Sequence, residues 1–259
     1  MPTVPSEPHD LRAAAESFGA DPERYDRSRP RYPAAMVDAI IAVSPGRDVL
    51  DVGVGTGIAA RQFQAAGCRV LGVDPDARMA EFARRGGIDV EVAAFETWQT
   101  TRVFDLVVSG QAWHWVDPVA GAAKAAEVLR PGGQIALFWN VFQLPPDLVD
   151  ACAEVHRRVM PGPLAEMATR PALDGYSMLC DRAADGLRGA FDEPERWRFE
   201  WTCEYTKDEW LDVLPTQGGY SQLPPARLAE LLAGLGDAVG DGFTAEYTTV
   251  LVTAERRAG

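Results

Sequence analysis

Apolar residues in the first half of the chain fall into short uninterrupted runs. Between them lie segments whose apolar residues recur every three or four positions. The short runs predict buried strands at residues 48–52, 69–73, 90–94, 104–108 and 134–139. The intervening and preceding segments predict helices at residues 34–43, 56–66, 76–85 and 118–129. Strands that alternate with helices of this length predict a parallel sheet with helices on both faces.

The alternation ends after Asn140. Residues 145–160 predict a helix, whereas residues 161–194 are rich in proline and glycine and predict loops. We therefore expect residues 141–195 to form an insertion that covers the sheet as a helical lid, and residues 1–259 to form a single domain.

Two strand-like segments follow this insertion, at residues 196–205 and 243–254. The second segment alternates along Tyr247, Thr249, Leu251 and Thr253, as a strand of an antiparallel pair does. Between the two segments, a predicted amphipathic helix has leucines at helical spacing, namely Leu228, Leu231, Leu232 and Leu235. These segments predict an antiparallel pair at the end of the sheet.

The composition is that of a globular protein with a full core. Of the 259 residues, 47% are hydrophobic and 24% are charged, and 38 acidic against 25 basic residues give a net charge of −13. This acidic balance does not favour nucleic acid, whose binders usually carry a basic stripe. Charged residues interrupt every apolar run before the about 20 residues that a membrane helix needs. We therefore expect a small-molecule partner, neither nucleic acid nor membrane, and a monomer or a homodimer.

The start of the chain and the cysteines bear on location. MPTVPSEPHD has no basic start followed by an apolar stretch, so it does not resemble a secretory signal. The 4 cysteines show no CxxC spacing, and the 3 histidines are scattered, so we expect no metal site. These features predict a cytoplasmic protein.

The turn after the first predicted strand has the strongest chemical signal. It reads Asp51-Val-Gly-Val-Gly-Thr-Gly57, and its glycines allow a tight turn whose N–H groups a ligand can approach. Asp74 ends the next predicted strand, where a carboxylate can accept hydrogen bonds from ribose hydroxyls. The two features together predict a site for a nucleoside cofactor.

The spacing of the glycines argues against a dinucleotide. The G-x-G-x-x-G pattern would place its third glycine at position 58, which is Ile58. Asp51 would repel a pyrophosphate but suits an ammonium group. An NAD(P)-dependent oxidoreductase is therefore the weaker alternative, and no Y-x-x-x-K pattern supports it.

This turn resembles the first motif of the class I S-adenosylmethionine-dependent methyltransferases, in particular their small-molecule branch. Residues 74–79 are similar to a second motif of that family, residues 104–108 to its fourth strand, and residues 129–133 to the turn before its fifth strand. The resemblance extends from Tyr25 to the last strand. It implies a doubly wound, seven-stranded, mostly parallel Rossmann-like sheet with an antiparallel last strand.

The resemblance also implies the cofactor site. Residues 1–35, which contain Arg29-Pro-Arg-Tyr-Pro33, would cover the cofactor; Asp74 would hold the ribose, and Met79 and Phe95 would lie at the adenine. The residue that contacts the adenine amino group stays open. Many relatives have an acid directly after the third strand for this contact, whereas this chain has Ala93-Ala-Phe-Glu96 there. The residues implied to bind S-adenosylmethionine are Tyr25, Arg31, Asp51, Gly53, Gly55, Gly57, Asp74, Pro75, Met79, Phe95 and Gln111.

Residues 111–115 follow the fourth predicted strand, at the edge of the sheet where ligands bind. Trp113 would face the sulfonium or the acceptor, and His114 would act as a general base; alternatively, both would pack or bind the backbone. His156 would bind substrate or lie on a solvated helix face, and Trp210 and Tyr220 would flank a lid hinge or fill the core. The substrate candidates are Trp113, Trp115, Trp139, Asn140 and His156.

The predicted reaction is methyl transfer to an oxygen, nitrogen or carbon atom of a small molecule. Because positioning supplies much of the rate of such an in-line displacement, a base is needed only if the acceptor must lose a proton. The Ala- and Arg-rich composition is typical of proteins from high-GC bacteria. In such bacteria, enzymes of this family often modify secondary metabolites. A methyltransferase scaffold that binds S-adenosylmethionine without catalysis, or for another reaction, is the remaining alternative.

Overall fold

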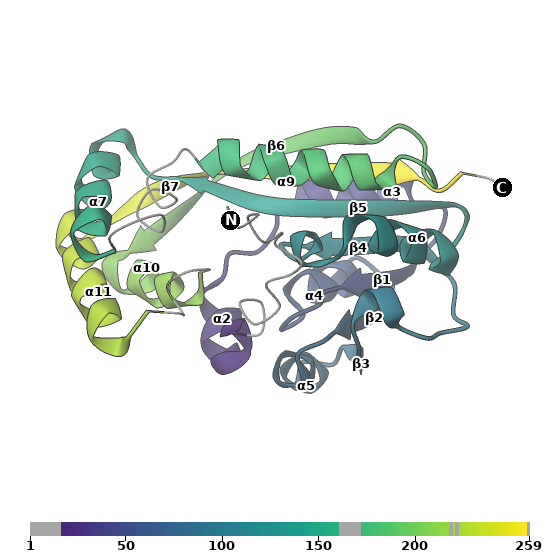
Figure 1. The fold of residues 1–259 in the computed structure, drawn as a ribbon, viewed down its shortest axis with the longest axis horizontal. Coiled ribbons are helices and arrows are strands. Elements are labelled where there is room, and N and C mark those ends of the chain that lie inside the picture. The colour runs from purple at the N-terminus through teal and green to yellow at the C-terminus, as the bar shows by residue number, and fades with distance from the viewer. Residues whose placement is uncertain (1–16, 161–171, 218–219, 221–222, 258–259) are drawn as a thin grey trace, which may run out of the picture.

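The computed structural model describes residues 17–160, 172–217, 220 and 223–257. Its strands form one sheet in the order β3-β2-β1-β4-β5-β7-β6 (Figure 1). The strands are β1 (Asp48–Val52), β2 (Arg69–Asp74), β3 (Asp89–Val92), β4 (Phe104–Gly110), β5 (Leu129–Gln143), β6 (Glu195–Thr206) and β7 (Gly242–Glu255).

The pairing of the strands confirms the predicted fold class. β1 pairs in parallel with β2 and β4, and the parallel part of the sheet extends to β3 on one side and β5 on the other. β7 is antiparallel to both β5 and β6. The sheet is therefore seven-stranded and mixed, with the last strand of the chain antiparallel to its two neighbours.

The helices flank this sheet and begin at local sequence signals. For example, Asp76 accepts a hydrogen bond at the start of α5, and Thr206 and Glu209 form a capping box on α10. The α-helices are α2 (Pro22–Ser28), α3 (Ala34–Val43), α4 (Ile58–Ala65), α5 (Ala77–Arg85), α6 (Pro118–Val128), α7 (Pro146–Val159), α9 (Ala172–Leu187), α10 (Lys207–Val213) and α11 (Pro225–Val239). Short 3₁₀ helices are η2 (Ser17–Ala20), η3 (Phe95–Thr97), η4 (Trp113–Trp115) and η5 (Leu214–Thr216).

Helix α9 corrects the prediction of loops over residues 161–194 at residues 172–187, whereas residues 161–171 lie outside the described part of the chain. Cys180, Ala183, Ala184 and Leu187 are buried at helical spacing and pack against the sheet. Gly186 suggested a loop but has a packing role, because a Cβ built on it would lie 2.6 Å from the Pro118 carbonyl oxygen. The glycine lets α9 lie close to the start of α6.

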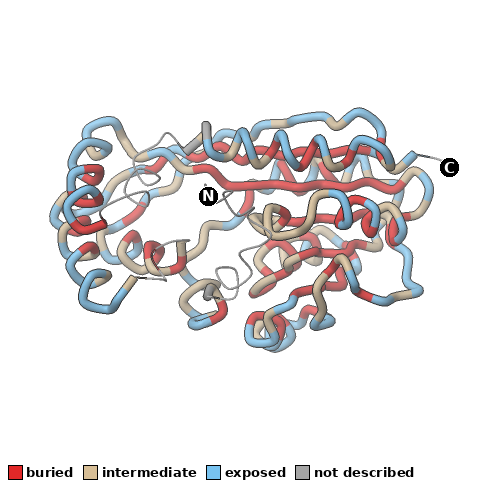
Figure 2. The backbone as a smooth tube through the Cα atoms, viewed as in Figure 1, coloured by how far each residue is buried: buried red, intermediate tan, exposed pale blue. Residues whose placement is uncertain are grey.

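Two apolar cores cover the two faces of the sheet (Figure 2). One contains residues of α6 and α9, and the other contains residues of α3, α4 and α5. Strands β1, β4 and β5 contribute to both cores, which explains why their sequences are almost continuously apolar.

A third core lies where β5, β6 and β7 extend beyond the parallel strands, and α7, α10 and α11 pack around it (Figure 1). Trp210 and Tyr220 belong to this core, so the packing interpretation of these two residues is correct. The other interpretation placed a lid hinge at the glycine pair between them, and this pair falls outside the described residues. Within the described part of the chain, every helix is too short or too polar to span a membrane.

Candidate active site

The glycine turn joins β1 to α4 and has a backbone that only glycine adopts easily. The φ angles are 69° at Gly53, 55° at Gly55 and 88° at Gly57, all in the left-handed region. A Cβ built on Gly53 would lie only 2.4 Å from the Cβ of Ala112, which follows β4. The turn therefore needs these glycines both for its conformation and for its contact with the neighbouring loop.

Asp74 lies at the end of β2 and holds the turn in place. Its Oδ2 accepts a hydrogen bond from the Gly55 N–H at 2.8 Å, and its Oδ1 accepts one from the Asp76 N–H at 2.8 Å. Burial raises the pKa of the Asp74 carboxyl to about 6, although these two backbone hydrogen bonds act to lower it. Because a carboxylate has about four acceptor positions, two remain for the hydroxyls of a ribose.

Asp51, at the start of the turn, is almost completely buried. Its Oδ2 atom has no hydrogen-bond partner among the described residues. Burial, together with the nearby charge of Asp74, raises the pKa of the Asp51 carboxyl to about 8, and a hydrogen bond from the Ala60 backbone acts to lower it. An unpaired buried acceptor of this kind fits the ammonium group of an amino-acid moiety.

Gln111 provides a second unpaired acceptor beside the turn. It follows β4 with a φ of 57°, which is uncommon for a residue with a side chain and costs about 1–3 kcal/mol. Its Nε2 donates to the Asn140 carbonyl at 3.2 Å, and its buried Oε1 has no partner among the described residues. The residues at this edge therefore fit the polar tail of S-adenosylmethionine.

The predicted adenine contacts differ in their surroundings. Met79 is buried, and a Cβ on Gly55 would lie 3.9 Å from its Cε, so the thioether covers the turn. Phe95 is also buried and packs against Trp113 with ring centroids 6.0 Å apart, whereas Pro75 is exposed. Glu96 accepts a hydrogen bond from the Asp117 N–H at the start of α6.

The segment before α3 is attached to the sheet near the glycine turn. Asp26 of α2 pairs with Arg61 of α4, the helix that begins at the turn, and also with the exposed Arg31 at 3.4 Å. Tyr25 is half-buried, and the Arg29 guanidinium lies 4.8 Å from its ring centroid. Helix α2 is thus close to the predicted cofactor site.

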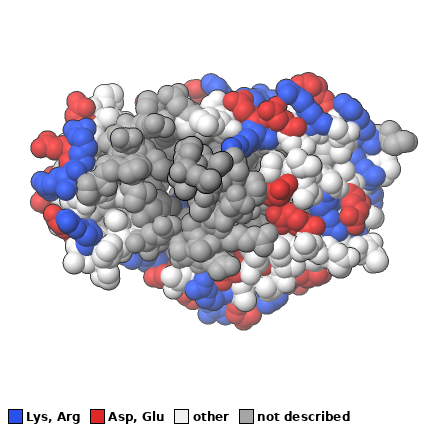
Figure 3. Space-filling view, in the orientation of Figure 1, with Lys and Arg blue, Asp and Glu red and all other residues white. Residues whose placement is uncertain are grey.

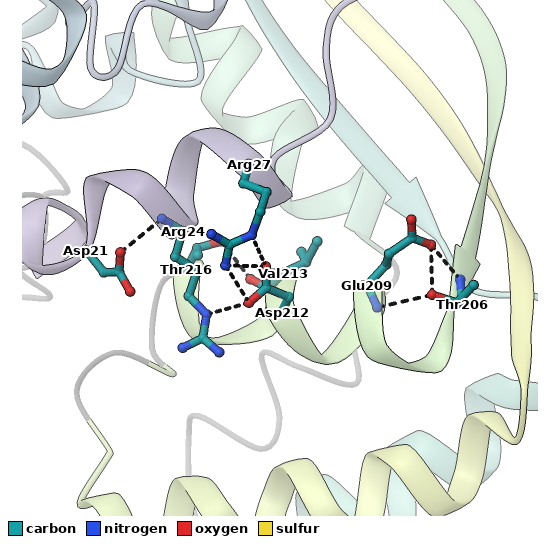
Figure 4. A network of polar contacts seen from close by, with 8 residues as sticks. All are labelled: Asp21, Arg24, Arg27, Thr206, Glu209, Asp212, Val213 and Thr216. Atoms are coloured by element: carbon teal, nitrogen blue, oxygen red, sulfur yellow. Dashed lines mark hydrogen bonds and ion pairs between the residues drawn. The ribbon is translucent and has the colours of Figure 1, made fainter. Parts of the chain in front are cut away.

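The same helix is also attached to α10, as Figure 4 shows. Arg24 Nε lies 2.8 Å from Asp212 Oδ1, and Arg27 Nη2 lies 2.8 Å from Asp212 Oδ2. Arg29 donates to the Thr216 carbonyl beyond α10. Helix α2 therefore connects the glycine turn to the third core.

His114 accepts a hydrogen bond through Nδ1 from the indole Nε1 of the fully buried Trp139 at 3.3 Å. The proton of the neutral ring is therefore assigned to Nε2, and the basic nitrogen is occupied. Burial lowers the pKa of His114 to about 4, so the ring is neutral at pH 7. This geometry favours packing over general-base catalysis.

Trp113 is buried against α6, and a Cβ on Gly121 would lie 3.4 Å from its ring. A cavity of about 20 Å³ lies beside it, and this volume holds little more than one water molecule. Its lining includes Trp113, His114, Val116, Pro118 and Leu179. The arrangement favours packing for Trp113 as well.

The remaining substrate candidates are dispersed. Trp115 is half-buried, with its ring centroid 6.3 Å from that of Phe18. Asn140 accepts from Thr249 Oγ1 at 2.6 Å and donates to the Arg31 carbonyl at 3.4 Å, so it connects the sheet to the N-terminal segment. Trp115 and Asn140 both lie against the described part of that segment.

His156 does not lie on a solvated helix face, so that interpretation is wrong. It is buried in the lobe around the third core, where Nδ1 lies 2.7 Å from the Cys152 carbonyl oxygen. Its Nε2 lies 2.6 Å from the Tyr220 hydroxyl. These contacts give the side chain a structural role in holding residue 220 against α7.

The sequence analysis missed Asp212, which pairs with Arg24 and Arg27, and the hydrogen bond from Arg29 to the Thr216 carbonyl. Asp212 had no local signal, because a single acid in an amphipathic helix is common. Thr216 had no local signal either, because its backbone carbonyl is the group that accepts. The spacing along the chain could not show that these residues approach one another.

On the face shown in Figure 3, basic and acidic residues are intermixed over the described surface. A search of the described residues finds no group of three or more His, Cys, Asp or Glu that could hold a metal ion.

Comparison with known proteins gives consistent matches. The family model described as a methyltransferase domain matches residues 50–137. An uncharacterised methyltransferase of Mycobacterium tuberculosis is 31% identical over 251 residues, which cover 92% of this chain and 95% of the relative. A malonyl-[acyl-carrier protein] O-methyltransferase of Enterobacter lignolyticus is 31% identical over 196 residues, 71% of this chain and 72% of the relative.

A solved structure from Anaeromyxobacter dehalogenans, described as a candidate type II methyltransferase, is similar over most of its length. It aligns with a TM-score of 0.64 at 25% identity, covering 89% of this chain and 99% of that chain.

Proposed function

This chain belongs to the class I S-adenosylmethionine-dependent methyltransferases, and from that premise we propose that it methylates a small-molecule acceptor next to the glycine turn. The observation that carries the proposal is that two buried acceptors at the carboxyl end of the sheet, Asp51 Oδ2 and Gln111 Oε1, have no hydrogen-bond partner in the part of the chain that the structure describes. Ligands of open α/β sheets bind at this end.

The residues of the turn and the following strand fit the cofactor. Asp74 would accept hydrogen bonds from the ribose hydroxyls. Asp51 would accept one from the ammonium group of the methionine tail, and Gln111 would accept one from another N–H of the same ammonium group. Met79 would cover the nucleoside from α5. Gly53, Gly55 and Gly57 let the backbone approach it closely.

The remaining predicted contacts are proposed with distinct roles. Tyr25 and Arg31, from the segment within residues 1–35, would close over the cofactor, because α2 is attached to α4 and α10. Pro75, directly after Asp74, would lie beside the ribose, and Phe95 would form the inner wall of the site at the adenine. Their positions at the ends of β2 and β3 support this assignment.

The cofactor supplies a methyl group on a sulfonium, whose sulfur leaves as a neutral thioether. The protein must therefore align the acceptor with the sulfur–methyl bond and exclude water, which can contribute about 7–11 kcal/mol. The buried turn and the attached helix α2 support this positioning role. His114 is not required as a base in this proposal, because its Nδ1 is occupied by Trp139.

The acceptor would lie between Trp115, Asn140 and the insertion proposed at residues 141–195. One relative is named for O-methylation of a malonyl group, which supports oxygen as the acceptor atom. The intermixed surface charge supports a small acceptor rather than nucleic acid. We also propose that the protein acts in secondary metabolism and in the cytoplasm.

A transfer assay tests this function. The purified protein is incubated with S-adenosylmethionine carrying a radiolabelled methyl group and with fractionated cell extract. We expect S-adenosylhomocysteine to form and the label to enter the low-molecular-mass fraction. Asp74→Asn should reduce both signals, whereas Asp237→Asn, an exposed acid on α11, should not. Label found only in nucleic acid, or no transfer with intact cofactor binding, would contradict the proposal.

A further inference from the structure

Strand β6 is the last strand of the sheet, and among the described residues no strand pairs with its outer edge (Figure 1). On its inner edge it pairs with β7 continuously from Glu195 to Thr206, with no shift in register. Soluble proteins usually protect a free edge with a bulge, a proline or a lysine. Strand β6 contains neither proline nor lysine, and its continuous pairing leaves no room for a bulge. Its outer edge is therefore a regular surface on which another strand can pair.

The hydrogen bonds at the end of β6 show which residues face outward. The Lys207 N–H donates to the Asp241 carbonyl at 3.0 Å, which continues the ladder between β6 and β7. Because hydrogen-bonded pairs alternate along an antiparallel ladder, the odd-numbered residues of β6 bond to β7. The Thr206 N–H accordingly points away from β7 and donates to Glu209 at 2.9 Å. The residues in the middle of β6 whose N–H and C=O groups face outward are Arg196, Arg198, Glu200 and Thr202.

The side chains of the even-numbered residues are exposed, and their charges follow an order. Arg196 and Arg198 lie in the first half of the strand, whereas Glu200 and Glu204 lie in the second half. Arg196 pairs with Asp181 of α9 at 2.6 Å. Within the described part of the chain, no ion pair involves Arg198 or Glu200. An antiparallel strand with the same sequence would place acids opposite the arginines, so the charge pattern of β6 is complementary to itself.

The other face of β6 has a row of aromatic side chains at its odd-numbered positions. Trp197 and Phe199 pack against the core that contains α3, and Trp201 packs against the third core. All three are only half-buried. Aromatic pairs across neighbouring strands stabilise antiparallel sheets, so a further strand with aromatic residues at the same positions would cover these rings.

We propose that β6 pairs with β6 of a second copy of this chain. The two strands would be antiparallel about a two-fold axis at Phe199, so that the sheet continues through the dimer. In this register, Arg198 of each copy lies opposite Glu200 of the other, and Trp197 lies opposite Trp201. An axis at Glu200 would instead place two glutamates opposite each other, which is unfavourable. The occupant is a second copy because the charges and the aromatic residues both match in the same register.

The test measures association of the full-length protein and of charge-reversal variants by sedimentation velocity, at concentrations up to about 200 µM. Arg198→Glu and Glu200→Arg are measured separately and as an equimolar mixture. Thr202→Pro removes an outward N–H but none that bonds to β7, and Thr202→Val is its matched control. Asp89→Arg is the control for charge reversal, because Asp89 is an exposed acid on β3, the opposite edge of the sheet.

We expect the unmodified protein to form a dimer. Arg198→Glu and Glu200→Arg should each weaken it by about tenfold, because each places like charges at both symmetric crossings. In the mixture, a copy of one variant meets a copy of the other with opposite charges at both crossings, so the dimer should re-form. Thr202→Pro should abolish the dimer, whereas Thr202→Val and Asp89→Arg should leave it unchanged. Thermal unfolding checks that each variant is folded.

The proposal is overturned if the unmodified protein stays monomeric over the whole concentration range. A dimer that persists unchanged in folded Thr202→Pro, or in both charge-reversal variants, would place the interface elsewhere and overturn it as well. Failure of the mixture to associate more strongly than either variant alone would reject the register at Phe199 and with it the proposal. All of these outcomes are independent of methyl transfer.

Discussion

Protonation of Asp51 should be coupled to cofactor binding. Burial, with the nearby charge of Asp74, places the pKa of this carboxyl at about 8, and its Oδ2 has no partner among the described residues. The charge of Asp74 raises this pKa and the Ala60 backbone lowers it, and the charge of Asp51 in turn acts to raise the pKa of Tyr32. In the absence of a cationic ligand, the carboxyl is therefore mainly protonated at pH 7.

The size of the effect follows from this pKa. At pH 7 a carboxyl with a pKa of about 8 is roughly nine-tenths protonated. An ammonium group placed against Asp51 favours the charged form, so binding should release between about one half and one proton. The apparent affinity should then increase by about threefold to tenfold for each pH unit between roughly pH 6 and 7. Asp74 contributes little at pH 7, since its pKa is about 6.

The same titration affects the stability of the protein without ligand. The folded pKa of Asp51 lies above its ordinary value of 3.8, so the folded protein holds the proton more tightly than the unfolded chain. This contribution to stability is fully present below about pH 4 and is lost as the pH rises to about 8. S-adenosylhomocysteine should therefore raise the melting temperature more at pH 8 than at pH 6.

Calorimetry in buffers of different ionisation enthalpy measures the number of released protons. S-adenosylhomocysteine is titrated into the unmodified protein and into Asp51→Asn at pH 7, in phosphate and in Tris. The binding enthalpy of the unmodified protein should differ between the buffers by the amount that corresponds to proton release. Asp51→Asn should show nearly equal enthalpies. Equal enthalpies in the unmodified protein would refute the proposed environment of Asp51.

Three further changes test other parts of the site. Asp74→Ala should weaken cofactor binding by about 1–3 kcal/mol in calorimetry, since ribose hydrogen bonds to a charged acceptor are lost; unchanged affinity would reject its ribose role. His114→Gln should leave the pH profile of kcat unchanged between about pH 6 and 8, because the pKa of His114 is about 4; loss of a titration step in that range would restore the general-base hypothesis. Asp212→Asn should expose α2 to faster limited proteolysis but cost only about 0.2–1 kcal/mol per partly exposed ion pair in chemical unfolding. The same proteolysis rate in Asp212→Asn and in the control Asp237→Asn would show that these ion pairs do not hold the helix.

The sequence predicted the elements whose apolar pattern is local. The runs at β1, β2 and β4 and the glycine turn follow directly from buried parallel strands and from left-handed backbone positions. The prediction failed at α9, where Gly175 and Gly186 suggested loops although the buried residues between them keep helical spacing. Gly186 serves close packing against α6, which a single sequence does not reveal.

The candidate site was predictable where one segment carries its chemistry. Asp51, the glycines and Asp74 lie on two consecutive βα units, so their proximity follows from the fold. The hydrogen bond from Arg29 to the Thr216 carbonyl could not be predicted, because the two residues lie far apart in the chain. The hydrogen bond between Trp139 and His114 likewise depends on how β5 lies beside η4.

The central claim is that the glycine turn and Asp74 together bind the adenosyl part of S-adenosylmethionine. A crystal structure of the protein with S-adenosylhomocysteine tests it most directly. The account predicts both ribose hydroxyls within about 2.6–3.2 Å of the Asp74 carboxylate oxygens and the amino group against Asp51. A nucleoside bound elsewhere, or a ribose turned away from Asp74, would contradict it.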